Sequence, residues 1–181
     1  MHIKKSAKVE VLIYLQGDNE LITTNRSSAG LQKDNLAKLT INNAPDFSGS
    51  LNASNNSQGT GAGIGGGYNA SGTNIYILGG SVTATSYLGA GIGGGYNAAN
   101  ANDTCDGGNG SNIHISNSSV IANSTSGAGI GGGCNASGAN GTCNGGNGSD
   151  IHISNSSVTA TSYWGGWYWR RSQCLWYKWH L

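Results

Sequence analysis

The amino-acid sequence predicts an all-β protein, a right-handed parallel β-helix of about five coils with three short strands each. Two observations carry this prediction. The glycine-rich string GAGIGGG occurs three times, at 61–67, 89–95 and 127–133. Between these copies, short runs of alternating apolar and polar residues are separated by Gly, Asn and Ser, a pattern typical of strands joined by turns. Units of this length bury their apolar side chains only by stacking on one another.

Three full repeat units begin with this string and cover 61–88, 89–126 and 127–164. The copies begin 28 and then 38 residues apart, because the first unit lacks about ten residues before its IxI pair. We expect these extra residues to form a loop at one corner. More divergent coils occupy 8–60, so the β-helix domain is predicted to span 1–164.

Each repeat unit contains three short apolar runs, AGI, IxI and VxA, and each is predicted to be a strand. In NIYI the two isoleucines face inward and Tyr76 faces outward. In SVTAT, at 81–85, Val and Ala face inward and the hydroxyl residues outward. Alternation in the first run predicts a flat outer face of bare backbone, formed by Gly61, Gly63 and Gly65. Parallel crossover connections are almost always right-handed, which sets the expected winding.

Composition excludes several functional classes. Charged residues make up only 9% of the chain and the net charge is +1, so there is no electrostatic basis for binding nucleic acid. No apolar run approaches the length of a membrane span, and the basic start MHIKKSAK precedes no sustained apolar segment of a signal peptide. Regular spacing of the hydrophobic residues argues against disorder.

Two rows of aromatic side chains are candidate ligand-binding groups. The residues of the first row occupy the same outward-facing position in successive coils. Those of the second row occupy another equivalent position, which Cys134 fills in the third unit. Their members are Tyr76, His114 and His152 in the first row, and Tyr68 and Tyr96 in the second. Such rows are consistent with metal binding, with stacking on a ligand, or with ordinary cross-strand packing. Ring faces beside Asn-rich loops suit sugars, because the amides bond the hydroxyl groups.

A candidate calcium site lies in the polar segments GGNGSNIHI, at 107–115, and GGNGSDIHI, at 145–153. They resemble the calcium-binding nonapeptide, although the copies are 38 residues apart rather than nine. The side chains that offer oxygen ligands are Asp103, Asp106, Asn109, Asn147 and Asp150. Polar turn residues are the alternative interpretation. GAGIGG also matches G-x-G-x-x-G, but no helix follows to form a dinucleotide site.

The cysteines leave two disulfide pairings open. Cys105 and Cys143 share a phase in successive units, whereas Cys134 and Cys143 bracket a loop of eight residues. Either pair could form a disulfide in an oxidising compartment, and spacing does not decide between them. The eight acidic residues are scattered and form no recurring acid–base pair, so we expect no enzymatic activity.

The repeat also carries a family resemblance. GAGIGGG followed by NIxI and GGSVTATS resembles repeats of large surface-exposed or secreted proteins. The order VLIYLQGDNELITT, AGLQ, LTI and GSLNAS is similar to extracellular carbohydrate-binding β-helix domains related to polysaccharide lyases, and the similarity covers 9–164. The resemblance implies a right-handed parallel β-helix, an extracellular or cell-surface location, binding of polysaccharide or host glycan, and often calcium. No cluster of Asp carboxylates with a basic partner matches the lyases.

Three functions compete. The first is a non-catalytic surface module that binds carbohydrate or serves as an adhesin or structural stalk, either as a monomer or stacked end to end. The second is a polysaccharide lyase or glycosidase, against which the missing acid–base cluster weighs. The third is ice binding through outward threonines, which are Thr83, Thr85, Thr159 and Thr161. Other residues interrupt the array, and the β-propensity of Thr explains these positions equally well.

The C-terminal segment 164–181, WGGWYWRRSQCLWYKWHL, differs from everything before it. If the array continued with its 38-residue period, the next GAGIGGG would begin at 165. Read one nucleotide later, every Trp codon must encode Gly, and residues 165–180 become compatible with G-A-G-I-G-G-G-x-N-A-S-G-T-N-G-T. Residues 127–142 read GAGIGGGCNASGANGT. We therefore expect 165–181 to be a frameshifted, non-native tail of a longer array.

Overall fold

Three five-stranded parallel sheets form the sides of a solenoid. The computed structural model describes residues 1–3, 10–34, 36–55, 58–98, 106–136 and 145–163. Sheet A contains β1 (His2–Ile3), β4 (Leu31–Lys33), β7 (Ile64–Gly65), β10 (Ile92–Gly93) and β14 (Ile130–Gly131). Sheet B contains β2 (Val11–Leu15), β5 (Leu39–Asn43), β8 (Gly72–Ile77), β12 (Gly110–Ser116) and β16 (Gly148–Ser154). Sheet C contains β3 (Gly17–Thr23), β6 (Gly49–Asn55), β9 (Gly80–Ser86), β13 (Ser118–Ser124) and β17 (Ser157–Ser162).

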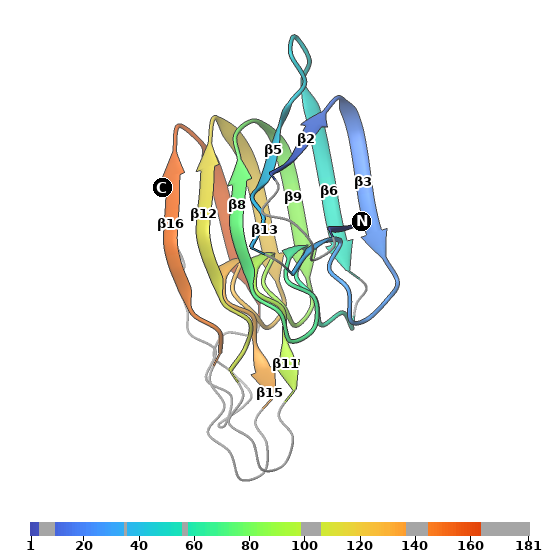
Figure 1. The fold of residues 1–181 in the computed structure, drawn as a ribbon, viewed down its shortest axis with the longest axis vertical. Helices are drawn as coiled ribbons and strands as arrows, with labels where there is room; N and C mark the ends of the chain where they lie inside the picture. The colour runs from blue at the N-terminus through green and yellow to red at the C-terminus, as the bar shows by residue number, and fades with distance from the viewer. Residues whose placement is uncertain (4–9, 35, 56–57, 99–105, 137–144, 164–181) are drawn as a thin grey trace.

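The chain visits sheets A, B and C in turn and then begins the next coil, so each sheet receives one strand per coil (Figure 1). All strand pairs that the structure describes are parallel, and equivalent residues of successive repeats are register partners. The fold is that of a right-handed parallel β-helix of five coils, as the repeat pattern predicts. The expected tail, 165–181, lies outside the described residues.

A short fourth pairing distinguishes the two longer repeats. Strands β11 (Asn97–Ala98) and β15 (Asn135–Ala136) pair in parallel between sheets A and B, at the lower end of Figure 1. The sequence predicts a corner loop here but no strand, because two residues are too few to show an alternating pattern. Most of the additional residues, 99–105 and 137–144, lie outside the described part of the chain.

Columns of identical or similar apolar residues fill the interior. Ile75 of β8 and Ile113 of β12 are register partners, as are Ile77 and Ile115, and their exposed fractions are 0–1%. Val82 and Val120 form the corresponding column in sheet C. Full burial of one such side chain contributes about 1.5–3 kcal/mol. Because each column runs along the solenoid axis, the apolar core is continuous between coils.

The structure overturns one prediction about the GAGIGGG strands. Gly61, Gly63 and Gly65 are buried, and they do not form an outer face of bare backbone. A Cβ added to Gly63 would lie 2.6 Å from the backbone nitrogen of Thr85, in sheet C of the same coil. The strand is only two residues long and lies at a corner, so its glycine side packs against backbone while Ile64 enters the core. Glycine is required there by close approach.

Lys33 introduces a buried charge at the end of β4. Its side chain has an exposed fraction of 0%, and its Nζ donates a hydrogen bond to the carbonyl oxygen of Thr73 at 2.6 Å. Burial lowers the pKa of Lys33 to about 8, and the neighbouring Asp34 opposes this shift. Burial in a low dielectric disfavours the charged form of an amine, which explains the direction.

The shifted pKa of Lys33 predicts that the protein becomes more stable as pH rises from about 8 to 10.5. In that window the unfolded chain holds a proton on Lys33 that the folded chain has lost, so the free energy of unfolding increases with pH. The full gain is roughly 3 kcal/mol at 1.36 kcal/mol per pKa unit.

Urea unfolding at pH 7, 8, 9 and 10 measures this gain in the free energy of unfolding. Lys33→Met should flatten the rise, whereas Lys38→Met, at an exposed lysine, should keep it. A rise that persists unchanged in Lys33→Met contradicts the assignment.

Candidate functional site

The first aromatic row forms a continuous stack on the outer face of sheet B. Tyr76, His114 and His152 are register partners on β8, β12 and β16, as their shared outward phase predicts. The ring centroids of Tyr76 and His114 are 4.5 Å apart with an interplanar angle of 6°. Those of His114 and His152 are 4.8 Å apart at 17°. Each inner ring face is therefore covered by the next ring.

The free end of this stack at Tyr76 is covered by a cation. Lys38 Nζ lies 4.7 Å from the centroid of the Tyr76 ring, within the range of a cation–π interaction. The same Nζ lies 3.0 Å from Glu10 Oε1, and Thr40 Oγ1 donates a hydrogen bond to that oxygen at 2.9 Å. The hydrogen bonds from Lys38 and Thr40 hold the pKa of Glu10 below its usual value. These contacts leave no open ring face at Tyr76.

A column of two amide side chains and one carboxylate runs beside the rings. Asn74, Asn112 and Asp150 occupy equivalent places in successive coils and have φ values of 57°, 52° and 51°. Asn and Asp tolerate this left-handed conformation better than other non-glycine residues. Asn74 Nδ2 donates a hydrogen bond to the carbonyl oxygen of Leu36 at 2.8 Å, which ties the column to an earlier coil.

Asn112 connects the column of Asn and Asp side chains to the aromatic stack. Its Nδ2 donates to Asn74 Oδ1 at 2.6 Å, and its Oδ1 accepts a hydrogen bond from the Tyr76 hydroxyl at 3.3 Å. His114 Nε2 lies 2.7 Å from the same oxygen. Asn112 is thus bonded to Asn74, Tyr76 and His114. These bonds join successive coils, in the manner of cross-strand pairs.

The stacked histidines are poorly arranged for a metal ion. The lone pair of an imidazole nitrogen lies in the plane of the ring, so the lone pairs of the nearly parallel His114 and His152 rings do not converge on one ion. In the described part of the chain, no group of three or more His, Cys, Asp or Glu side chains is placed to hold a metal. The geometry does not favour the metal alternative for this row.

The second row has a different geometry. The ring centroids of Tyr68 and Tyr96 are 6.4 Å apart and the rings are tilted by 36°. Tyr68 keeps an exposed fraction of 40%, and the pair lies beside the short corner strands β7, β10 and β11. Tilted rings do not cover each other's faces as parallel rings do, so the Tyr68 ring remains accessible. The pair therefore retains an aromatic surface for a ligand, as does the exposed His152 at the end of the row on sheet B.

Backbone hydrogen bonds hold the tyrosine pair in place. The Tyr68 N–H donates to the carbonyl oxygen of Ser27 at 2.8 Å, and the Tyr96 N–H donates to that of Thr60 at 2.7 Å. The Asn69 N–H donates to the Tyr96 carbonyl oxygen at 3.0 Å and joins the two coils directly. The aromatic residues are therefore fixed by the same ladder that builds the solenoid.

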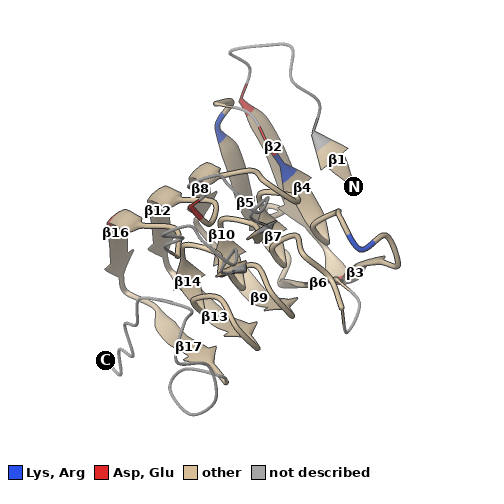
Figure 2. Ribbon diagram, turned by 90° about the horizontal axis from the view of Figure 1, so that it is seen from below, with Lys and Arg blue, Asp and Glu red and all other residues tan. Residues whose placement is uncertain are grey.

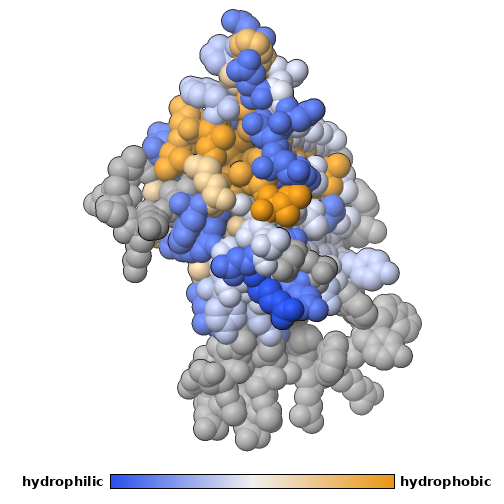
Figure 3. All heavy atoms as spheres, turned by 90° about the vertical axis from the view of Figure 1, so that its right-hand side faces the viewer, coloured by the Kyte–Doolittle hydropathy of each residue, from blue (hydrophilic) through white to orange (hydrophobic). Residues whose placement is uncertain are grey.

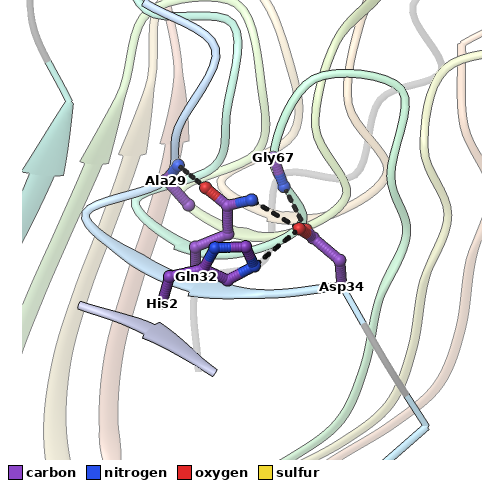
Figure 4. A network of polar contacts seen from close by, with 5 residues as sticks. All are labelled: His2, Ala29, Gln32, Asp34 and Gly67. Carbon is purple, nitrogen blue, oxygen red and sulfur yellow. Dashed lines mark hydrogen bonds and ion pairs between the residues drawn. The ribbon is translucent and has the colours of Figure 1, made fainter. Parts of the chain in front are cut away.

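Asp34 anchors the residue that precedes Tyr68 (Figure 4). Its Oδ1 accepts a hydrogen bond from the Gly67 N–H at 2.7 Å. Its Oδ2 accepts one from Gln32 Nε2 and lies 3.3 Å from His2 Nε2. The sequence pattern does not identify Asp34 as a site residue, because it belongs to a divergent coil and Gly67 lies 33 residues away. No local pattern signals a contact of that separation.

The candidate calcium ligands are distributed over the ladder between coils. Asn109 Oδ1 accepts a hydrogen bond from the Asn147 N–H at 2.8 Å, so this oxygen already joins two coils. Asp106 accepts through its carbonyl oxygen from Asn97 Nδ2 at 3.0 Å, and Asp150 lies within β16. Asp103 lies outside the described residues. The contacts of Asn109 and Asn147 match the alternative interpretation, polar turn residues.

Cys134 occupies the third place of the tyrosine row. The N–H groups of Tyr96 and Cys134 bond equivalent carbonyl groups, those of Thr60 and Leu88, at 2.7 and 3.1 Å. Cys134 is buried, and its Sγ lies 3.6 Å from the carbonyl oxygen of Asn135. Cys105 and Cys143, the other members of the expected disulfides, lie outside the described residues.

The outer face of sheet C carries the threonines. Thr83 and Thr85 of β9 are register partners of Ile121 and Asn123 of β13. Thr159 and Thr161 of β17 follow in the same rows. Ile121 is 44% exposed, so an apolar side chain interrupts the hydroxyl row at its centre. The sequence predicts this interruption, which is unfavourable for ice binding.

Comparison with known proteins supports the fold. A family model described as "Beta helix repeat" matches residues 75–96 and 113–134. Both segments begin in a sheet B strand, continue through the sheet C strand and end after the next sheet A strand, so each spans most of one coil. No curated protein and no solved structure matches the chain. Within the described ranges, the structure contains no helix long and apolar enough to cross a membrane. Over those two segments the chain is similar to β-helix repeat proteins, in agreement with its three parallel sheets.

Proposed function

We propose that this chain is a non-catalytic β-helix module of a secreted or cell-surface protein and that it binds polysaccharide at Tyr68 and Tyr96. The observation that carries the proposal is the tilted tyrosine pair, whose Tyr68 ring remains 40% exposed on a backbone fixed by hydrogen bonds. A rigid aromatic side chain loses little conformational entropy when it contacts a ligand. Its ring face accepts the C–H surface of a sugar.

The charge distribution favours an uncharged polysaccharide. Lys and Arg are absent between residues 39 and 169, so the repeat units that carry the tyrosines contribute no cation. Most charged residues of the described structure, and all of its Lys and Arg, lie in the first two coils, and the later coils carry only the acidic Asp106 and Asp150 (Figure 2). A neutral ligand requires no ion pair. Its retention should therefore change little with salt concentration.

Binding to insoluble polysaccharides tests the proposal. We expect retention on at least one neutral polysaccharide, cellulose and xylan included, and a loss of about tenfold in affinity for Tyr68→Ala, which corresponds to 1.4 kcal/mol. Tyr96→Ala should show a similar loss, because Tyr96 supports the Tyr68 ring. A depletion assay and a glycan array provide the measurements.

Tyr14→Ala is the matched control, because Tyr14 is an exposed tyrosine on β2, in the first coil. It should leave the affinity unchanged. Equal losses for Tyr68→Ala and Tyr14→Ala would remove the tyrosine pair from the binding site. Failure of the unmodified chain to bind any polysaccharide would leave a structural stalk as the function.

A further inference from the structure

We infer that the C-terminal end of the solenoid is a docking surface for one further coil of its own repeat. Strands β14, β16 and β17 are the last members of sheets A, B and C, and each has a neighbour on one side only within the described structure. The three edges belong to the same coil. Together they form one complete end face rather than a single unpaired strand (Figure 1).

The end face exposes side chains whose equivalents are buried in the coils between the two ends of the solenoid. Ile130, Ile151, Ile153 and Val158 are only partly buried. Their register partners one coil earlier, Ile92, Ile113, Ile115 and Val120, have exposed fractions of 0–1%. The residue types are the same, so the difference comes from the position in the array. A further coil would bury these side chains in the same way as the equivalent residues of the internal coils are buried.

The backbone donors of the last coil continue a regular pattern. In the preceding coil, Gly91, Ile92 and Gly94 donate N–H bonds to the carbonyl oxygens of Ala128, Gly129 and Gly131, at 2.9–3.0 Å. The same pattern joins the two coils before them. The equivalent donors of the last coil are Gly129, Ile130 and Gly132, and no described residue accepts from them. One further coil would supply three acceptors in the same order.

Glycine spacing shows where the next backbone fits. Gly65, Gly93 and Gly131 share φ values of 132–133°, which L side chains rarely adopt. A Cβ on Gly65 would lie 2.1 Å from the carbonyl oxygen of Gly93, and one on Gly93 would lie 2.0 Å from that of Gly131. A Cβ on Gly131 meets nothing closer than 3.5 Å. The space that the next carbonyl occupies in earlier coils is open.

The two ends of the solenoid differ in charge. Asp18 and Glu20 lie in β3, an edge strand of the first coil, and Figure 3 shows hydrophilic residues among the apolar ones at that end. Charged side chains on edge strands prevent pairing with another chain. Strands β14, β16 and β17 contain a single charged residue, Asp150. The C-terminal face therefore has the composition of an internal coil interface.

The sequence identifies the occupant. Residue 169 lies 38 positions after Gly131, where the array requires glycine, and Trp169 read one nucleotide later must encode Gly. Tyr168, 38 positions after Ile130, becomes Ile or Thr in that frame. The coil encoded by the shifted frame from residue 165 onward is therefore the partner that this face fits.

The first test is the nucleotide sequence. The codons for residues 165–171 should read GAGIGGG when they are translated one nucleotide later. Any other reading overturns the assignment of the occupant.

The second test is hydrogen exchange on a restored chain, in which residues 165–180 are replaced by GAGIGGGYNASGTNGT. Tyr fills the undetermined place, as at Tyr68 and Tyr96. The amides of Gly129, Ile130 and Gly132 should exchange at least tenfold more slowly than in the unmodified chain. A control chain carries IGGAGGG at 165–171 and should show no such gain. An equal gain in the control would overturn the inference.

Gly131→Ala is the control substitution that should prevent the added segment from pairing with the end face. In the restored chain it should abolish the added protection, because its Cβ would take the place of the incoming carbonyl, while Gly91 and Ile92 stay protected. Light scattering should show a monomer throughout. Protection that appears in the unmodified chain together with a doubled mass would assign the face to a second copy and overturn the inference. None of these readouts depends on polysaccharide binding, so they remain decisive whether or not the proposed function holds.

Discussion

Gly93→Ala is expected to prevent the last two coils from stacking. The new Cβ would lie 2.0 Å from the carbonyl oxygen of Gly131, a distance that requires a backbone shift. It would also force a non-glycine residue to adopt a φ of 133°. The neighbouring bonds from Ile92 and Gly94 to the next coil lie on either side of this position and would be strained. We expect a loss of more than about 4 kcal/mol, at the extreme of single substitutions.

Gly131→Ala in the unmodified chain separates the two causes. Its φ of 132° is the same, but its Cβ meets nothing within 3.5 Å, so only conformational strain of about 1–3 kcal/mol remains. Urea unfolding followed by circular dichroism compares the two variants. If both lost the same stability, backbone conformation alone would explain the glycine requirement, and close coil contact would not.

Ile115→Ala is expected to be the second most damaging substitution. Ile115 is 1% exposed and packs between Ile77 and Ile153 in one column of sheet B. Removing three carbon atoms from a site enclosed by two coils leaves a cavity, and such substitutions cost about 2–5 kcal/mol. Thermal unfolding should show the corresponding decrease in the melting temperature.

Ile153→Ala is the matched control for Ile115→Ala. It removes the same atoms from the same column, but Ile153 is partly exposed in the last described coil. Its loss should be less than half of that for Ile115, because less apolar surface returns to water and the site can collapse. Equal losses would show that the last coil is covered in solution.

The coil architecture could be predicted from the sequence because its signal is repeated. One alternating run such as NIYI is ambiguous, but its recurrence as NIHI and DIHI at equal positions sets both the strand and the register. The stacking of Tyr76 on His114 follows from that register, since residues at one phase must become neighbours. Periodicity therefore predicts positions along the solenoid axis well.

Contacts across the coil could not be predicted in this way. Alternation places Gly63 outside, but a two-residue strand at a corner is packed on both sides, and Gly63 meets the backbone of sheet C. The tilt between Tyr68 and Tyr96, which distinguishes this pair from the parallel rings on sheet B, depends on ring orientation rather than on spacing. The contact of Asp34 with Gly67 of the next coil could not be predicted for a different reason, because Asp34 lies in a divergent coil that the repeat does not align.

The exact registration of like with like has a genetic consequence. His114 pairs with His152 and Ile113 with Ile151, so each interface between full repeats joins nearly the same residues. Recombination that deletes or duplicates 89–126 as a unit would create no new kind of contact. The protein could then lengthen or shorten in whole-coil steps of about 4.8 Å. The length of the solenoid would then vary by inheritance, while its fold and its surface chemistry stay the same.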